Sequence, residues 1–395
     1  MDNFIVLISK DAFCREYLPA YGNRFWAGKT PNIDELAEKG TVFTSYYTAA
    51  PSSAMAYLSM FTGEYAHETE IETFKPVQRQ YQGDTLFDKA NALGYETHII
   101  WDTAWMDAAK VYSECYGRNT TFHSIDNLRQ GVGAHYIHKG FLRPNVELSQ
   151  KTMQKLKNEL EIILSNGEKI FLWIHLPHVL NGSVSYGSDV DVYDHFVGIV
   201  RKYVGDERIF ITSDHGNMNG RKGKLCYGFD VYDPAIRIPL ITPRKEALPV
   251  CDRNISSVDL CDILFSKKIP KERKFIYSDS AYYVQEHRKL AIIHGKYKYI
   301  YNNKTGLEEL YDTDYDPEEK FSIMKDFMFD EDRKITTPAR ELYFYPEWDK
   351  LPEIRKMLHE ERVHVWRNPS LKQKFLNFAK DKLRVAYAKI HRVKM

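Results

Sequence analysis

The chain has 395 residues, which is enough to bury a large core, and we expect one large domain with one or two appendages. Hydrophobic residues (43%) and charged residues (28%) occur in the ordinary proportions of a globular protein, and a net charge of +1 gives no general attraction for nucleic acid, which we exclude as a partner. The longest apolar runs have only the length of strands, so we expect no transmembrane helix.

The first predicted element is a strand over residues 4–8, where a continuous apolar run indicates burial on both faces of a sheet. Asp11 follows this strand and is expected at its carboxyl end. Because the strand begins so near the N-terminus, it leaves no room for a signal peptide. We therefore expect a cytoplasmic location, with peripheral contact at a membrane as an alternative.

The next segment predicts a helix over residues 30–40, a strand over 42–47 and a second helix over 54–61. Ser52 and Ser53 precede the second helix. A serine at a helix N-terminus faces unpaired amides and the positive end of the helix dipole, which favour an alkoxide and a bound oxyanion. Either serine is therefore a candidate nucleophile, and the alternative is a simple helix cap.

The remaining pattern alternates between helices and strands, which indicates a mostly parallel sheet flanked by helices. Helices are expected over residues 84–93, 148–164 and 190–204, and strands over 96–100, 170–174, 209–212 and 238–241. Short strands over 290–293 and 298–301 then predict a small antiparallel sheet. The expected organisation is a catalytic α/β domain (1–270), an antiparallel subdomain (271–330) and a helical basic tail (331–395).

The strand over residues 209–212 ends on Asp214, His215 and Gly216. One hard oxygen ligand beside one imidazole nitrogen suits zinc, manganese or magnesium better than calcium. If this strand is a parallel neighbour of the first one, Asp11 meets Asp214 and His215 at the same sheet edge. The alternative is that the three residues form only a turn and a helix cap.

Several stretches, in the same order along the chain, resemble the sulfatase and alkaline phosphatase superfamily. They include a Thr-Pro-Asn helix start, Thr-Gly-x-Tyr-x-His after the second helix, Thr-Ser-Asp-His-Gly, and Ser-Val-Asp-Leu, and they lie within residues 3–11, 30–43, 62–67, 212–216, 232–241, 257–260 and 296–317. The resemblance implies an alkaline-phosphatase-like fold with a small C-terminal antiparallel sheet. Beyond about residue 330 it ends, and a helical tail is expected.

Carried over residue by residue, the resemblance implies that Asp11, Asp214 and His215 are metal ligands. It places the nucleophile at Ser53, whose oxygen would also contact the metal, with Ser52 as the alternative register. We expect one divalent ion, with Mn²⁺ favoured and Zn²⁺, Mg²⁺ or Ca²⁺ as alternatives.

The departures from the sulfatase pattern concern the same site. The stretch from Ser53 to Tyr57 lacks the proline and arginine that formylglycine maturation requires, residues 101–104 lack the lysine and histidine that hold sulfate, and Lys10 replaces an acid. What remains resembles single-metal phosphotransferases such as lipoteichoic-acid-synthase-like enzymes and phosphoethanolamine transferases.

We therefore expect a metal-dependent hydrolase or transferase that acts on phosphoesters through a serine phospho-enzyme. The expected substrate is a phosphorylated small molecule, a glycan or a lipid-linked compound. The alternatives are a sulfuric ester hydrolase and a catalytically silent binding protein.

Other candidates surround this site. His175 and His178 follow the strand over residues 170–174, and either could hold a phosphoryl oxygen or protonate the leaving group. Lys222 and Lys224 could neutralise substrate charge, and the alternative is that both lie on a surface loop. Tyr227 stands near a position where many relatives have a histidine, which disfavours a second metal.

The rest of the chain provides two expectations. The apolar positions of residues 371–390 have helical spacing and a basic polar face, which suits a membrane surface, a second copy of the chain or packing on its own domain. The five cysteines have no metal-binding spacing and are expected as free thiols: Cys14, Cys115, Cys226, Cys251 and Cys261.

Overall fold

The computed structural model describes residues 4–23, 28–69, 81, 83–102, 117, 119–125, 135–138, 141–144, 146–166, 169–176, 186–224, 226–281, 288–324 and 345–366. The chain divides into a large unit, Met1–Tyr345, and a small unit, Pro346–Met395. The small antiparallel sheet expected within residues 271–330 lies inside the large unit. The basic helix expected over residues 371–390 lies outside the described residues.

The large unit is built on a sheet of eight strands in the order β11-β2-β10-β9-β1-β8-β4-β5. All of these strands run parallel except β10, which is antiparallel to both of its neighbours. Their bounds are β1 Phe4–Lys10, β2 Thr41–Phe43, β4 Glu96–Asp102, β5 Thr120–Ile125, β8 Ile170–Leu176, β9 Ile209–Ser213, β10 Leu240–Thr242 and β11 Val250–Cys251. The expected mostly parallel sheet is confirmed.

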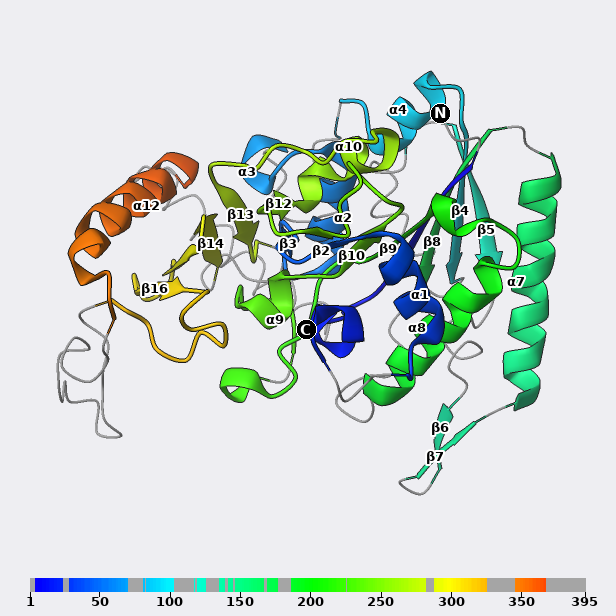
Figure 1. Ribbon diagram of the computed structural model, residues 1–395, viewed down its shortest axis with the longest axis horizontal. Coiled ribbons are helices and arrows are strands. Elements are labelled where there is room, and N and C mark those ends of the chain that lie inside the picture. Colours follow the sequence, from blue (N-terminus) through cyan, green and yellow to red (C-terminus); the bar gives the residue numbers. More distant parts are fainter. Residues whose placement is uncertain are drawn as a thin grey trace, which may run out of the picture. The chain divides into compact units, whose positions relative to one another are not determined.

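Helices cover both faces of this sheet (Figure 1). On one face lie α1 Pro31–Lys39, α7 Val146–Asn166 and α8 Tyr186–Val200, and on the other α2 Ser53–Thr62, α4 Leu86–Ala92 and α10 Leu260–Phe265. Alternate residues of β1 enter the two cores: Val6 and Ile8 face one, and Ile5 and Leu7 the other. The apolar run of β1 is thus explained by burial on both sides.

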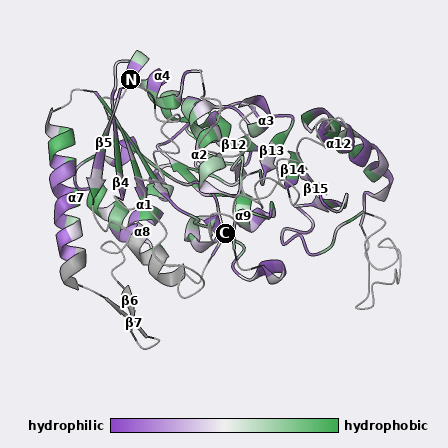
Figure 2. Ribbon diagram, turned by 180° about the vertical axis from the view of Figure 1, so that it is seen from behind, coloured by the Kyte–Doolittle hydropathy of each residue, from purple (hydrophilic) through white to green (hydrophobic). Residues whose placement is uncertain are grey.

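Burial of an apolar face and capping of the helix ends stabilise these helices. In α7, the buried residues Met153, Leu156, Leu160 and Ile163 recur at helical intervals, and Figure 2 shows hydrophobic and hydrophilic residues side by side on this helix. The N-terminus of α1 is capped from a distance, because the Asp194 carboxylate on α8 accepts the Ile33 N–H at 2.8 Å. This contact joins the two helices on that face.

The strand expected over residues 42–47 is in fact two strands in different sheets. β2 belongs to the main sheet, whereas β3 Tyr46–Tyr47 pairs with β12 Ile255–Ser256. Between them, the Arg237 guanidinium binds the Thr44 carbonyl oxygen at 2.9 Å and the Ser45 hydroxyl at 2.9 Å. These side-chain bonds take the place of ladder bonds and let the chain leave the main sheet.

The second sheet of the large unit is an antiparallel meander of four strands: β13 Ile276–Asp279, β14 Lys289–His294, β15 Tyr297–Asn302 and β16 Glu308–Asp312. It is joined to α9 Asp233–Ile236 through the fully buried Lys298. The Lys298 ammonium lies 2.8 Å from the Asp233 carboxylate and 2.7 Å from the Glu319 carboxylate.

Shorter elements complete the described chain. They are α3 Ala66–Thr69, the hairpin β6 His135–His138 and β7 Phe141–Pro144, and the 3-10 helices η1 Arg15–Tyr17, η2 Pro19–Tyr21, η5 Asp206–Arg208, η6 Arg221–Gly223 and η7 Ser257–Asp259. The small unit contains η9 Trp348–Lys350 and α12 Leu351–Val365. Within the described residues, no helix has both the length and the apolar character needed to cross a membrane.

Candidate metal and nucleophile site

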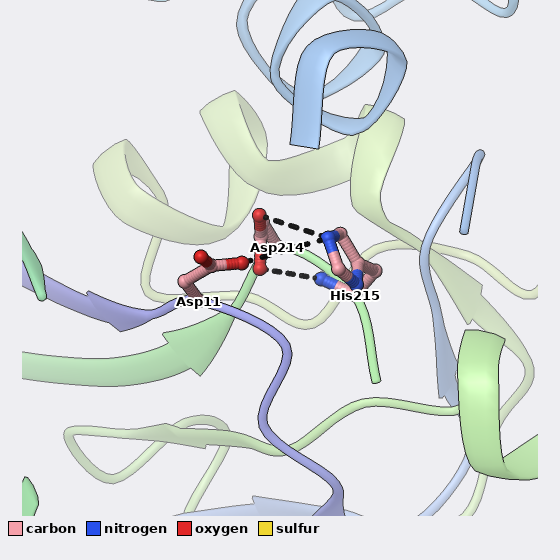
Figure 3. A group of neighbouring side chains, drawn as sticks. All are labelled: Asp11, Asp214 and His215. Carbon is pink, nitrogen blue, oxygen red and sulfur yellow. Dashed lines mark hydrogen bonds and ion pairs between the residues drawn. The ribbon is translucent and has the colours of Figure 1, made fainter. Parts of the chain in front are cut away.

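Two adjacent parallel strands bring the predicted metal ligands together. The register of β1 and β9 pairs Lys10 with Ser213, so Asp11 and Asp214 leave neighbouring strands at the same edge. His215 follows, and Figure 3 shows the three side chains converging. Among the described residues, only these three form a group of carboxylate and imidazole ligand atoms that lie within 4.8 Å of one another.

The donor atoms are arranged to receive a cation. One Asp214 carboxylate oxygen, Oδ1, accepts the N–H groups of Ala12 (3.1 Å) and His215 (2.8 Å), whereas Oδ2 is buried without a hydrogen-bond partner. The Nδ1–H of His215 donates to the Gly216 carbonyl oxygen at 2.8 Å, which leaves the Nε2 lone pair directed inward. The Nε2 atom lies 3.5 Å from Asp214 Oδ2 and 3.6 Å from Asp11 Oδ1.

This convergence fits a divalent metal. Two buried carboxylates and an inward lone pair place negative charge in a space with little solvent, which is unfavourable unless a cation or an added proton compensates it. Two oxygen donors and one nitrogen donor match the preferences of manganese, zinc or magnesium. The geometry therefore supports a metal site without identifying the metal.

Ser53 completes the group. It is the first residue of α2, and its hydroxyl oxygen lies 3.1 Å from His215 Nε2 and 3.5 Å from Asp11 Oδ1. The Ser53 side chain is only partly buried, unlike the three ligands, so it borders both the ligand group and solvent.

Ser52 has a different environment. It occupies the N-cap position of α2, but its side chain is fully buried and its hydroxyl oxygen has no hydrogen-bond partner, so it makes no capping bond. Of the two serines, Ser53 is therefore the one whose hydroxyl lies beside the candidate ligands Asp11 and His215.

Close backbone packing fixes the loop that carries the ligands. A Cβ atom at Gly216 would lie 2.0 Å from the Pro234 carbonyl oxygen on α9, so only glycine fits there. Ala12, directly after Asp11, has a φ of 53°, which is unfavourable for a residue with a side chain and indicates a backbone held in place by its surroundings. This conformation directs the Ala12 N–H to Asp214.

Cys14 links the two ligand-bearing loops. Its sulfur accepts the Asn217 N–H at 3.2 Å and lies 3.2 Å from the Asn217 carbonyl oxygen, and it contacts the Pro234 carbonyl oxygen at 3.3 Å. The sequence indicated only a free thiol, and no local pattern predicts these contacts, because Asn217 lies 203 residues away.

His175 lies at the end of β8 but not at the surface. It is 3% exposed, and its Nδ1 atom lies 2.6 Å from the Tyr57 hydroxyl and 2.9 Å from the Ser9 hydroxyl. Burial lowers the pKa of His175 to about 3, so the imidazole is neutral near pH 7. A neutral, enclosed imidazole is poorly suited to give a proton to a leaving group.

The buried neutral state of His175 has a consequence for stability. Between about pH 6.5 and pH 3 the unfolded chain binds a proton at this residue and the folded chain does not, so stability should fall as the pH falls, by about 1 kcal/mol per pH unit. We expect His175→Asn to reduce this slope in urea unfolding measured from pH 7 to pH 4. The exposed His195 on α8 provides the control, and an equal reduction in His195→Asn would contradict the assignment.

The two predicted lysines have partners on other elements. Lys222 binds the Glu319 carbonyl oxygen, and its ammonium lies 4.3 Å from the centre of the Tyr232 ring. Lys224 pairs with Asp230 at 3.1 Å and is 38% exposed. No contact of either lysine with the ligand group is seen in the described chain, and their role in substrate binding stays a prediction.

Two other sequence predictions concern Tyr227 and His178. The Tyr227 ring packs against His215 with 4.5 Å between ring centres, so Tyr227 borders the candidate metal site. His178 lies outside the described residues.

Comparison with known proteins agrees with this fold. The family model described as Sulfatase matches residues 3–179. Together with the fold, this match supports the resemblance to the sulfatase and alkaline phosphatase superfamily. The resemblance and the fold class inferred from the sequence are thereby confirmed.

Individual relatives are distant. The chain is similar to the uncharacterised sulfatase YidJ of Escherichia coli (strain K12), with 22% identity over 401 residues that cover 76% of this chain and 79% of the relative. Among solved structures it is similar to a 2-O GAG sulfatase, BT1596, with a TM-score of 0.64, 16% identity and 93% of both chains covered. It is also similar to the phosphonate monoester hydrolase of Agrobacterium radiobacter, with a TM-score of 0.59, 15% identity, and coverage of 92% of this chain and 95% of that one.

At these identities the solved structures show a shared fold and nothing finer. They include one protein named for sulfate and one named for a phosphorus-containing ester, so the fold by itself does not distinguish the two chemistries.

Proposed function

We propose that the protein is a metal-dependent phosphoester hydrolase or phosphotransferase in which Ser53 forms a phospho-enzyme. The observation that carries this proposal is the position of the Ser53 hydroxyl, 3.1 Å from His215 Nε2 beside two buried carboxylates. A hydroxyl in this position is suited to in-line attack on a phosphoryl group held at the same metal. The proposed substrate is a phosphorylated small molecule, a glycan or a lipid-linked compound.

The residues around Ser53 favour phosphorus over sulfur. Ala54, Met55, Ala56 and Tyr57 follow Ser53, without the proline and arginine that accompany conversion to formylglycine. Lys10 precedes Asp11 and is fully buried, so this position supplies no second carboxylate to the site. A serine beside one pair of acids is compatible with a phosphoserine mechanism.

The proposed mechanism assigns a role to each residue of the site. Asp11, Asp214, His215 and Ser53 would hold one divalent ion, which would lower the pKa of the serine hydroxyl and polarise a phosphoryl oxygen. Ser53 attacks phosphorus, its oxygen bonds to the phosphoryl group, and the bond to the leaving group breaks. The leaving group departs with the proton that Ser53 releases.

The phosphoryl group is then transferred from Ser53 to water or to an acceptor hydroxyl. The amides of the first turn of α2, which have no carbonyl partner within the helix, would favour the negative charge of phosphoryl oxygens bound beside Ser53. Whether water or a bound acceptor attacks decides between hydrolase and transferase.

Mass spectrometry of the intact protein tests this proposal. The protein is incubated with Mn²⁺ and a panel of aryl phosphomonoesters and phosphodiesters, quenched in acid and weighed, and the modified peptide is mapped. On the peptide that contains Ser53 we expect the mass of one phosphoryl group from a monoester, and of one aryl-phosphoryl group from a diester, which loses only one of its two aryloxy groups. Hydrolysis of 4-nitrophenyl sulfate in preference to every phosphoester would overturn the proposal.

A sulfuric ester hydrolase is the second candidate. It is favoured by the Sulfatase family match and by the structural similarity to the 2-O GAG sulfatase. The same panel distinguishes the two, because turnover of the aryl sulfate by a protein whose Ser53 carries no modification would favour sulfate chemistry.

A further inference from the structure

The helix that begins at Ser53, α2, is joined to the main sheet by a buried polar contact. Tyr57 lies one turn after Ser53 on α2, and its side chain is fully buried. Its hydroxyl lies 2.6 Å from Nδ1 and 3.1 Å from Nε2 of His175 on β8. Because Tyr57 and Ser53 are on one rigid helix, a movement of the Tyr57 hydroxyl also moves the Ser53 hydroxyl.

The same imidazole contacts the strand that carries Asp11. His175 Nδ1 lies 2.9 Å from the hydroxyl of Ser9, which is two residues before Asp11 on β1. The Ser9 hydroxyl oxygen in turn accepts the indole N–H of Trp173 at 2.8 Å. The network therefore joins the nucleophile helix to the strand end that presents the metal-binding acid.

Aromatic rings enclose the network. The ring centres of Trp101 and Trp173 lie 4.8 Å and 5.7 Å from that of His175, and the Tyr57 ring meets the imidazole edge-on at 5.2 Å. Hydrogen bonds in so dry an environment are stronger and more directional than exposed ones, and their loss leaves a buried polar atom unsatisfied. The enclosure therefore resists small shifts of α2 relative to β1.

We propose that His175 is a positioning residue, which holds Ser53 at its working distance from Asp11 by joining Tyr57 to Ser9. This role rests on the proposed function, in which Ser53 is the nucleophile. It assigns His175 no contact with the reacting atoms, in keeping with its enclosure among Tyr57, Trp101 and Trp173.

Tyr57→Phe is the informative variant, because it removes the hydroxyl and retains the packed ring. With bis(4-nitrophenyl) phosphate and Mn²⁺ as the probe, we expect kcat to fall roughly tenfold while KM changes less than about twofold. Tyr345→Phe is the matched control, since Tyr345 is also a buried tyrosine but its hydroxyl binds Asp312 at 2.6 Å in the small sheet. That control should leave kcat unchanged.

Two substitutions of His175 separate positioning from proton transfer. His175→Asn retains a short polar group near the Nδ1 position and should retain much of the activity, whereas His175→Leu should lose more than Tyr57→Phe does. Equal and complete loss in both variants, with wild-type kcat in Tyr57→Phe, would overturn the positioning role.

A binding measurement keeps this inference distinct from the proposed chemistry. In a Ser53→Cys variant, Cd²⁺ at the ligand group should contact the thiolate and produce an ultraviolet charge-transfer band. Adding Tyr57→Phe should weaken that band and leave Cd²⁺ stoichiometry at one. If the wild-type protein forms no phospho-enzyme but the band responds in this way, the proposed function fails and the positioning role stands; an unchanged band would contradict the positioning role.

Discussion

Ser53→Ala should lower kcat for phosphoester turnover by about 10³-fold or more and abolish the phosphoryl mass gain. The reason is geometric: Ser53 provides the hydroxyl beside His215 Nε2 and Asp11, and no water placed by chance would be held as well for attack. Steady-state kinetics with an aryl phosphoester, at saturating Mn²⁺, measure the loss.

Ser52→Ala is the control for this variant. The two serines are adjacent in sequence, but the Ser52 hydroxyl is buried without a partner, so its removal should leave kcat within about twofold of the wild-type value. A Ser52→Ala protein as inactive as Ser53→Ala, with the phosphoryl group mapped to Ser52, would show that the nucleophile had been assigned one residue too far along the chain.

Asp214→Asn should weaken Mn²⁺ binding by about 10²-fold or more, because it removes the charge of the unpartnered Oδ2 and leaves Asp11 as the sole acid of the group. In the wild-type protein, free metal at 100 times its Kd should stabilise the folded state by about 2.7 kcal/mol, and this gain should disappear in the variant. Metal analysis and thermal unfolding with and without Mn²⁺ provide the two measurements.

An acid outside the site controls for the loss of a surface charge. Asp206 lies in η5, which precedes β9, whereas Asp214 follows the opposite end of that strand. Asp206 pairs with Arg201 at 2.7 Å, and Asp206→Asn should bind Mn²⁺ as the wild-type protein does. One tightly bound ion per chain is expected. Two ions per chain, or undiminished binding by Asp214→Asn, would contradict the single-metal site.

The strand ends could be predicted from the sequence because their signals are local. The apolar runs before Asp11 and Asp214 define strands, and the polar residues after them must emerge at the sheet edge. That the two strands are neighbours followed from the resemblance and is confirmed by their parallel register.

The interior of the site could not be predicted in the same way. The contacts that hold it join residues far apart in sequence: His175 is 118 residues from Tyr57 and 166 from Ser9. A histidine at a strand end suggested a solvent-facing catalytic group, and only the packing of three aromatic rings around it shows that it is enclosed. The left-handed Ala12 likewise has no signal in its own side chain.

Local patterns also failed where tertiary contacts redirected the chain. The sequence predicts one strand over residues 42–47, yet the Arg237 guanidinium binds the Thr44 carbonyl oxygen and the segment is divided between two sheets. The antiparallel direction of β10 also could not be predicted from its own residues, because strand direction depends on the path of the connection.

The buried Lys298 determines which parts of this protein could be exchanged with a relative. Loop 214–217 rests on α9, whose first residue, Asp233, relies on an ammonium group supplied by the small antiparallel sheet. A chimera that imported a foreign sheet without this lysine would leave Asp233 with only the Arg237 guanidinium, at 3.2 Å, as an ion-pair partner beside the candidate metal site. Recombination near residue 270 would separate Asp233 from Lys298 and Glu319, and we expect it to alter metal affinity at the candidate site along with any change in specificity. These three residues would therefore have to be exchanged together with Asp214, His215 and Gly216.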